Sequence, residues 1–239
     1  MALDELTSFD LYVQHQVHIA QFARGEIINS LKQLERMQND VISRLNQTSE
    51  LTKSSKARLQ RELSGIVGQI KDGYDAIGKS YEGSSAEFAL SESRWQAKTL
   101  SGLSEGDVAI ISFSEIAGDK SLNQFEGKPF TRHLADISKR DSLLVRRAVV
   151  DGVALGRSNR EIGKTLEDAL KLGKRDIQTL VRTGIQSNAA AIRDQYFAGN
   201  QDIVRAVWWV ATLDGRTTVI CRTRDGLQWE AISKKPISH

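Results

Sequence analysis

The stretch SFDLYVQHQVHIAQFARGEIINSLKQLERMQNDVISRLN, residues 8–46, sets the fold class of this chain. Its apolar residues recur mostly in steps of three and four, the spacing that places side chains on one face of an α-helix. We therefore predict one long helix from about Ser8 to Asn46. The residues of its apolar face are Val13, Val17, Ala20, Ile27, Leu31, Leu34, Met37, Val41 and Leu45.

A second run with the same spacing follows a polar connection at residues 47–55. We predict a second long helix that ends at Gly83 and packs antiparallel against the first as a helical hairpin. Both apolar stripes are narrow, and the glycines of the second helix each lower its stability by roughly 1 kcal/mol relative to alanine. The hairpin is therefore expected to need a partner. The candidate interface residues are Leu31, Leu34, Ile66 and Ile70, and the second stripe consists of Leu59, Leu63, Ile66, Ile70, Tyr74, Ile77 and Tyr81.

The pattern weakens between Ser84 and Pro129, which we interpret as a linker or insertion region. A short helix is expected around Glu87 to Leu100. The apolar run from Val108 to Ile111 fits either a strand or a buried helical turn, because periodicity does not separate the two in so short a run.

Helical spacing returns after Pro129. We expect helices from Thr131 to Lys139, from Asp141 to Leu155, from Ser158 with Ile162, Leu166 and Ala169 inward, and from Lys174 to about Ala198. The patterns together predict a mainly α fold with a long N-terminal helical hairpin and a helical C-terminal body closed by a small antiparallel β module. The expected domains are 1–83 (helical hairpin), 84–129 (linker or insertion) and 130–239 (helical body plus β hairpin).

The turn between two of these helices has recognisable chemistry. Gly156 is placed to cap the preceding helix, while Ser158 and Glu161 have capping-box spacing. A helix, a short turn and a basic second helix also describe a DNA-reading helix-turn-helix, but simple helix packing is favoured because no dimer element or strong basic surface accompanies it. The candidate DNA contacts in that alternative are Arg157, Arg160 and Lys164.

Basic residues between Arg140 and Arg175 are interspersed with acidic ones. This mixture favours a solvated surface over a nucleic-acid stripe. If the cations instead segregate to one face, the sequence predicts salt-dependent phosphate binding.

The β module is expected near the C-terminus, in the stretch that starts at Trp208-Trp209 and ends near Trp229. We predict a strand, a tight turn at Asp214-Gly215, a second strand ending near Cys221, and a type I′ hairpin turn at Asp225-Gly226. Adjacent residues of a strand point to opposite faces, so one of the two indoles, with Trp208 as the candidate, is expected to point outward. It is there either at a partner interface or buried by a second covering layer such as the Trp229 strand.

This module resembles the C-terminal signature of tailed-phage head morphogenesis proteins, the Mu F-like minor head family. The residues that carry the resemblance are Trp209, Thr212, Leu213, Asp214, Arg216, Thr217, Cys221, Arg222, Asp225 and Gly226. The resemblance continues upstream, where residues 155–162 and 180–185 are similar to the starts of two helices that precede the β module in the family. The resemblance therefore covers roughly Phe125 to His239. It implies a structural component of a virion, not an enzyme.

Composition limits the function classes independently. With 40% hydrophobic and 26% charged residues, 239 residues are enough to form a real core, which argues against disorder. A net charge of +3 predicts only modest general affinity for nucleic acid. The single cysteine fits a reducing cytoplasm, and the start of the chain lacks the pattern of a secretory signal.

Three chemical interpretations of the C-terminal residues compete with a structural one. A nucleophilic Cys221 would need a histidine base, and His239 is the only histidine nearby in sequence. A zinc site at Cys221 and His239 would have only two of the four ligands it needs. We therefore favour a buried packing cysteine and no cofactor. The resembled family commonly has further cysteines here, which this chain lacks. Asp214 and Asp225 with Arg216 suggest an acid pair with a cationic clamp, but turn chemistry explains them more simply.

The resulting hypothesis is a non-enzymatic minor head protein, made in the host cytoplasm and located in the virion, near the portal vertex or in the capsid interior. Its expected partners are the portal protein, the major capsid or scaffold protein and packaged DNA, with no membrane partner before ejection, and it is a candidate homo-oligomer on the portal. A role in head assembly, DNA packaging or ejection is implied by the resemblance alone. The alternative is a nucleic-acid-binding protein or a metal-dependent phosphodiesterase.

Overall fold

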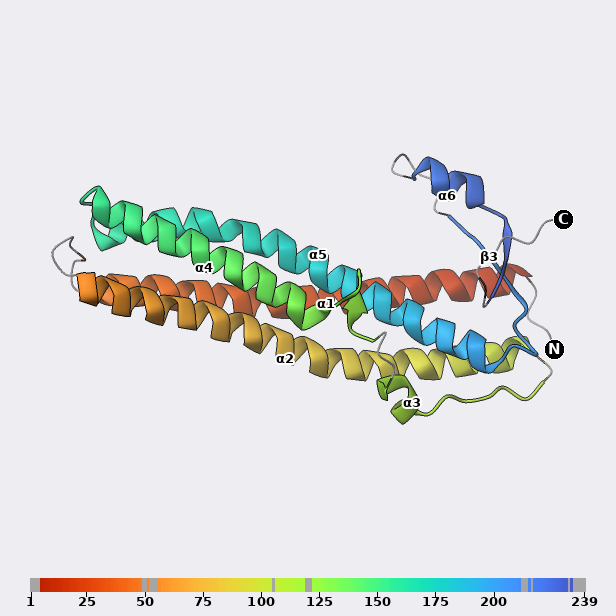
Figure 1. Ribbon diagram of the computed structural model, residues 1–239. Helices are drawn as coiled ribbons and strands as arrows, with labels where there is room; N and C mark the ends of the chain where they lie inside the picture. The colour runs from red at the N-terminus through yellow and green to blue at the C-terminus, as the bar shows by residue number, and fades with distance from the viewer. Residues whose placement is uncertain are drawn as a thin grey trace. The chain divides into compact units, whose positions relative to one another are not determined.

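The computed structural model describes residues 5–48, 51, 56–104, 106–118, 122–211, 215, 217–231 and 233. The protein is mainly helical, as predicted, with long N-terminal helices and a small antiparallel sheet near the C-terminus (Figure 1). The helices of the described chain are α1 (Glu5–Gln47), α2 (Lys56–Leu103), α3 (Phe113–Gly118), α4 (Phe130–Ala154), α5 (Asn159–Gly199) and α6 (Val219–Arg224). The strands are β1 (Gln124–Phe125), β2 (Lys128–Pro129), β3 (Ala206–Trp208) and β4 (Gln228–Glu230).

The chain divides into two compact units, and each combines distant parts of the sequence. The first, which we call the bundle unit, consists of His15–Phe88 and Asn123–Asn188. The second, the terminal unit, consists of Met1–Gln14, Ala89–Leu122 and Ala189–His239. Three long helices, α1, α2 and α5, therefore contribute residues to both units.

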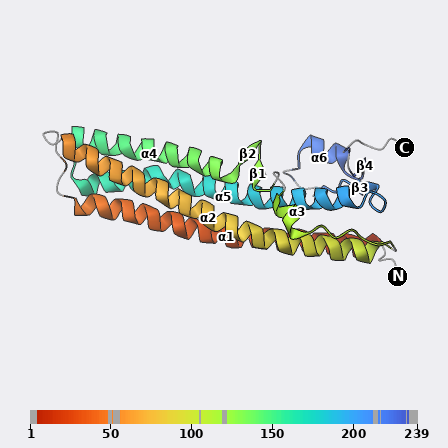
Figure 2. The ribbon, with the colours of Figure 1, turned by 60° about the horizontal axis from the view of Figure 1, so that its bottom comes forward.

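The bundle unit contains segments of α1, α2, α4 and α5 that run side by side (Figures 1 and 2). Hydrogen bonds join Asn29 to Ser80 and Arg44 to Glu62, so α1 and α2 are antiparallel, as predicted for the N-terminal hairpin. The side chain of Gln38 donates to the Leu170 carbonyl, which links α1 to α5. The unit is thus a four-helix bundle whose core lies between two helical hairpins.

The stripe predicted for α2 is confirmed, because every member from Leu63 to Tyr81 is buried. The stripe predicted for α1 is correct only in its second half. Val13 and Val17 are exposed, whereas the polar residues His15 and Ser30 are buried. The core-facing positions of α1 are His15, Ile19, Ala23, Ser30, Leu34, Met37, Val41 and Leu45.

Three helices are longer than predicted. The prediction that the second helix ends at Gly83 is wrong, because α2 continues to Leu103, and residues 84–103 are therefore helix, not linker. A glycine inside a helix costs only about 1 kcal/mol, which burial of the following apolar residues Phe88 and Ala89 can offset. The breaks predicted within α4 and within α5 are also absent, since each forms one continuous helix.

The turn between α4 and α5 has the predicted local chemistry. Gly156 has a φ of 71°, and the amides of Gly156 and Arg157 donate to the carbonyls of Val153 and Gly152, which is the Schellman arrangement. The Glu161 carboxylate accepts from the Ser158 amide at 2.8 Å, and the Glu161 amide donates to the Ser158 hydroxyl. These bonds complete the capping box and satisfy free amides at the start of α5.

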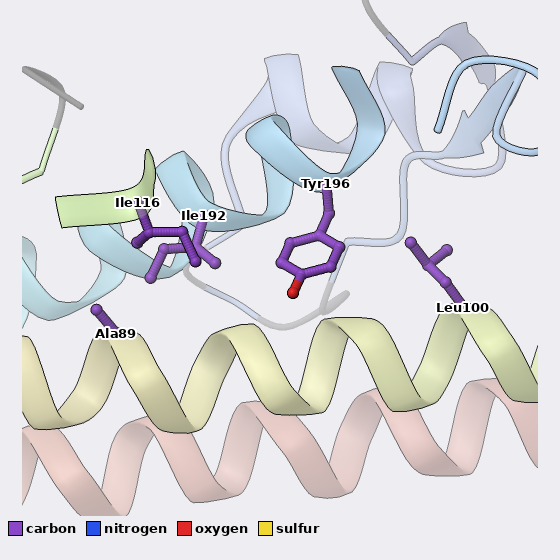
Figure 3. Packing of buried hydrophobic residues seen from close by; sticks show 5 residues of the cluster. All are labelled: Ala89, Leu100, Ile116, Ile192 and Tyr196. Carbon is purple, nitrogen blue, oxygen red and sulfur yellow. The ribbon is translucent and has the colours of Figure 1, made fainter. Parts of the chain in front are cut away.

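The terminal unit has its own apolar core (Figure 3). In it the Tyr196 ring lies in a cluster with Leu100 and Ile116, and its hydroxyl shares a hydrogen bond with Ser93 at 2.8 Å. Val108 and Ile111 pack against this cluster from a segment that is neither strand nor helix. The Asn200 amide nitrogen donates to the Ala109 carbonyl and its oxygen accepts from the Ala109 amide, so these bonds hold the segment in place.

Candidate functional site

The C-terminal module is built on two strands that are close in space but separated by a helix in sequence. Val207 pairs with Trp229, and Trp208 with Gln228, in the antiparallel register of β3 and β4. The pairing extends past β3, because the Trp209 amide donates to the Leu227 carbonyl and the Gly226 amide donates to the Trp209 carbonyl. Trp209 is thereby held by its backbone beside the turn that precedes β4.

An arginine lies over two indoles in this module. The Arg224 guanidinium carbon is 5.5 Å from the centroid of the Trp209 ring and 5.1 Å from that of Trp229. The two ring centroids are 6.3 Å apart with an interplanar angle of 49°. Each cation–π contact contributes roughly 0.5–1 kcal/mol at an exposed site, so Arg224 helps to fix both rings.

The segment before the turn is a short helix, which corrects the prediction of a strand ending near Cys221. Thr218 caps α6 through its hydroxyl, which accepts from the Cys221 amide at 3.2 Å. Cys221 lies in α6 and is partly exposed, so it is not the buried packing residue that we expected. Asp225 follows the helix, and its carboxylate accepts a hydrogen bond from the Ala211 amide, so it links the turn to a distant residue instead of forming the local turn bond that we predicted.

The turn at Asp225-Gly226 is of type II, not type I′. Asp225 has φ −58° and ψ 130°, Gly226 has φ 74°, and the Leu227 amide donates back to the Arg224 carbonyl. The prediction of a positive φ at Gly226 is confirmed, but the negative φ of Asp225 excludes the mirror-image turn.

Gly226→Val is expected to destabilise the C-terminal module by about 1–2 kcal/mol, because a β-branched residue is strained at positive φ. Gly226→Asn is the matched control, since asparagine adopts this conformation at much lower cost. The measurement is hydrogen exchange at the Trp209 amide, which reports opening of the module. Equal protection in the valine variant and in the wild type would show that the turn does not need a glycine.

Several apolar side chains of the module are exposed to solvent. Trp208 is 63% exposed, Val219 75% and Ile220 61%, and Val210 and Leu227 are also exposed. Trp209 is less exposed because Trp229 and Arg224 cover it. We call the exposed side chains of Trp208, Val210, Val219, Ile220 and Leu227 the module surface. Exposed large apolar residues that accumulate in one small module are a reason to consider it a site of protein association.

Some predicted site residues lie outside the described residues, namely Thr212, Leu213, Asp214, Arg216 and His239. The suggested pairing of Asp214 with Asp225 and the suggested ligand pair of Cys221 with His239 therefore have no described geometry. Within the described part of the chain, no group of three or more His, Cys, Asp or Glu side chains is arranged to hold a metal ion. Thr217 and Arg222 are described, and Arg222 is exposed.

The candidate partner interface on the N-terminal helices is corrected by the structure. Leu34, Ile66 and Ile70 are fully buried in the core of the bundle unit, and Leu31 is partly buried. Their narrow stripes are covered by α4 and α5 of the same chain, so they are not free to bind another protein in this fold. Of the predicted interface residues, Trp208 is the exposed one.

The candidate DNA contacts Arg157, Arg160 and Lys164 are all exposed, at the turn and along the first turns of α5. A DNA-reading helix-turn-helix places two short helices at a steep angle. Here α4 and α5 are 25 and 41 residues long and run side by side after the turn (Figures 1 and 2). The three cations therefore belong to a long helical hairpin.

A buried polar network that sequence reasoning missed lies in the bundle unit. Asp141 is fully buried and accepts from the Tyr74 hydroxyl at 2.6 Å and from Arg140 Nη2 at 2.7 Å. Arg140 also pairs with Asp176 on α5. Burial, followed by the charge of Asp141, raises the pKa of Tyr74 well above its ordinary value, so this hydroxyl keeps its proton and donates. The network is structural, because its members satisfy one another.

The chain matches no protein-family model, no curated protein and no solved structure. Among the helices of the described part of the chain, none combines the length and the apolar character needed to span a bilayer.

Proposed function

We propose that this protein is a structural minor head protein of a tailed phage, without enzymatic activity. It is made in the host cytoplasm and built into the procapsid near the portal vertex. The resemblance of its C-terminal residues to the head morphogenesis signature supports this proposal. Trp209, Asp225 and Gly226 belong to that signature. The Gly226 amide donates to the Trp209 carbonyl, and the Asp225 carboxylate accepts from the amide of Ala211, two residues after Trp209.

The observation that carries the proposal is the module surface. Protein interfaces gain most of their binding energy from a few side chains near their centre, among which tryptophan is enriched. Trp208 is such a residue. Together with Val219 and Ile220 it is exposed on a module whose backbone is held by turn and strand hydrogen bonds. The module surface thus serves as the docking site for the portal protein, with the major capsid or scaffold protein as the other candidate partners.

Copurification tests the docking site. The tagged chain with Trp208→Ala, Val219→Ser and Ile220→Ser is expected to recover at least about tenfold less portal protein than the wild type, because loss of central apolar anchors costs over 1 kcal/mol each. The matched control is Leu143→Ser with Val150→Ser, which removes exposed apolar side chains from α4 of the bundle unit. Equal recovery by the module variant and the control would exclude the module surface as the docking site.

Partner binding is better tested by substitution of surface residues than by deletion of the N-terminal helices. A deletion through Gly83 would remove α1 and cut α2 inside the bundle, which exposes the apolar residues of α4 and α5. Any loss of a partner would then reflect unfolding. Recovery of nucleic acid in place of a virion protein, or metal-dependent cleavage of duplex DNA that Asp214→Asn abolishes, would favour the binder or the phosphodiesterase instead.

A further inference from the structure

One exposed stripe of α5 carries cations along most of the bundle unit. At 3.6 residues per turn, its basic residues within the bundle unit fall in an arc of roughly 100°, and they span about 33 Å of helix at 1.5 Å per residue. All of them are exposed. We call this set the α5 stripe, and its members are Arg160, Lys164, Lys171, Lys174, Arg175 and Arg182.

The charge of the chain is concentrated on the same hairpin. Residues 123–188 contain 13 Lys and Arg against 8 Asp and Glu, whereas residues 15–88, the other part of the bundle unit, contain 10 against 9. The first segment therefore carries a formal charge of +5, more than the +3 of the whole chain. The net charge of the whole chain is smaller than that of residues 123–188, because the residues outside this segment are acidic overall.

Few acids neutralise the α5 stripe. Lys171 pairs with Asp168 at 2.6 Å, and Glu167 falls within the same arc. The other members, Arg160, Lys164, Lys174, Arg175 and Arg182, form no ion pair among the residues that the structure describes. Asp176 is turned away to Arg140, and Asp151 pairs with Arg147 on α4.

The position of one of these cations is unfavourable for the helix itself. Arg160 lies in the first turn of α5, where the helix dipole disfavours positive charge by roughly 0.3–1 kcal/mol. Helix stability therefore does not explain Arg160, whereas an anionic partner along the stripe would.

The surroundings of the cations narrow the class of partner. A helix lying in a membrane surface inserts its apolar face among the lipids, but the apolar face of α5, with Leu166, Leu170 and Ile177, is buried in the bundle unit. Between Arg160 and Arg182 the arc contains no aromatic side chain, on which the bases of a single strand would stack. A nucleic-acid duplex, in contrast, presents a linear array of phosphates with about one charge per 1.7 Å and offers no bases for stacking.

We propose that the α5 stripe binds the phosphate backbone of a nucleic-acid duplex without reading its sequence. The stripe is about as long as one helical turn of duplex DNA, roughly 34 Å, so along that length its cations meet phosphates of both strands where the strands cross the contacted face. Flexible lysines and arginines that contact phosphates position a protein on a duplex but carry no sequence information. This inference does not depend on the docking of the module surface.

Binding to a duplex DNA of about 30 base pairs, roughly three helical turns, tests the proposal over a series of salt concentrations. For the wild-type chain, the logarithm of the association constant is expected to fall against the logarithm of salt concentration with a slope of about −4 to −5, near 0.9 for each unpaired cation of the stripe. The test variant replaces Lys164, Lys174, Arg175 and Arg182 by glutamine. It is expected to bind at least about tenfold more weakly at 0.1 M salt, with a slope smaller by about 3–4.

The control variant replaces Lys32, Arg36, Lys71 and Lys79 by glutamine, which removes the same charge from exposed positions of α1 and α2. It is expected to keep nearly the wild-type slope. Both variants are expected to remain folded, since exposed lysine, arginine and glutamine have similar helix propensities, and circular dichroism melts check this. Equal losses in the two variants, or no duplex binding by the wild type at about 0.05 M salt, would overturn the proposal.

Other probes separate the related ligands. Duplex RNA shares the phosphate array and is expected to bind, whereas a single strand of thymidines and vesicles with anionic lipids are expected to bind at least about tenfold more weakly than duplex DNA. Binding of vesicles or of the single strand as tightly as the duplex would contradict the assignment of the stripe to duplex phosphates.

Discussion

Asp141→Ala is expected to destabilise the bundle unit by about 2–4 kcal/mol, because it removes hydrogen bonds to a buried carboxylate and leaves a buried hydroxyl without an acceptor. The fully buried Asp141 accepts from Tyr74 and from Arg140. Its removal leaves the Tyr74 hydroxyl in the core without an acceptor and leaves Arg140 with Asp176 alone. Urea unfolding followed by circular dichroism gives the free energy of unfolding directly.

Two controls separate the buried network from a general effect of charge. Tyr74→Phe removes one hydrogen bond but leaves Asp141 paired with Arg140, and it is expected to cost only about 1 kcal/mol. Asp151→Ala removes a carboxylate that forms an exposed ion pair with Arg147, and it is expected to cost less than about 1 kcal/mol. If Asp141→Ala costs no more than Asp151→Ala, the network does not hold the helices together.

The fold class could be predicted from sequence because long helices leave a repeated signal. In α2 the apolar residues coincide with the buried positions, so the stripe was correct. In the first half of α1, apolar Val13 and Val17 are exposed while His15 is buried, so the apolar pattern has the wrong phase. Polar residues at core positions defeat a prediction that counts only apolar ones.

Local chemistry was predicted well where it depends on neighbouring residues only. The capping motifs around Gly156 and Ser158 need no distant partner, and both form as expected. The same kind of signal was available at Thr218, whose hydroxyl caps α6. A run as short as Val219–Arg224 fits a strand or a helix equally well by periodicity, so the cap was the feature that separates them.

The site on α5 was hidden by a wrong helix boundary. A break near Gly173 divides the basic residues between two helices, and no common face then exists. In the continuous helix, the basic residues from Arg160 to Arg182 lie on one face. This is the segregation of cations on which the less favoured prediction, salt-dependent phosphate binding, depended. Gly173 does not end the helix, although glycine lowers helix propensity, and it lies where the side chains of Tyr74 and Asp141 approach the α5 backbone.

The same close approach of helices makes Gly184 the second position with a large expected effect. A Cβ at Gly184 would overlap the Tyr81 hydroxyl and lie 3.3 Å from Phe130. Tyr81 cannot move aside easily, because it is fully buried and its ring stacks on Phe130 with centroids 3.6 Å apart. Gly184→Ala is therefore expected to destabilise the protein by about 2 kcal/mol, the cost of overpacking less the gain of about 1 kcal/mol in helix propensity.

A glycine in open space provides the control of opposite sign. Gly83 is helical, and a Cβ there meets no atom within 4 Å. Gly83→Ala is expected to stabilise the protein by up to about 1 kcal/mol, because only the propensity term remains. If both alanine variants shift the free energy of unfolding in the same direction, helix propensity and not close packing governs these glycines.

A double-mutant cycle assigns the clash at Gly184 to one atom. The Tyr81 hydroxyl has no hydrogen-bond partner among the described residues, so Tyr81→Phe alone is expected to cost less than the roughly 1 kcal/mol of Tyr74→Phe. In the Gly184→Ala background, Tyr81→Phe removes the overlapping oxygen and is expected to recover about 1 kcal/mol. Additive effects of the two substitutions would place the strain elsewhere. Recovery would show that the position needs glycine because Tyr81 of α2 approaches the α5 backbone so closely at Gly184.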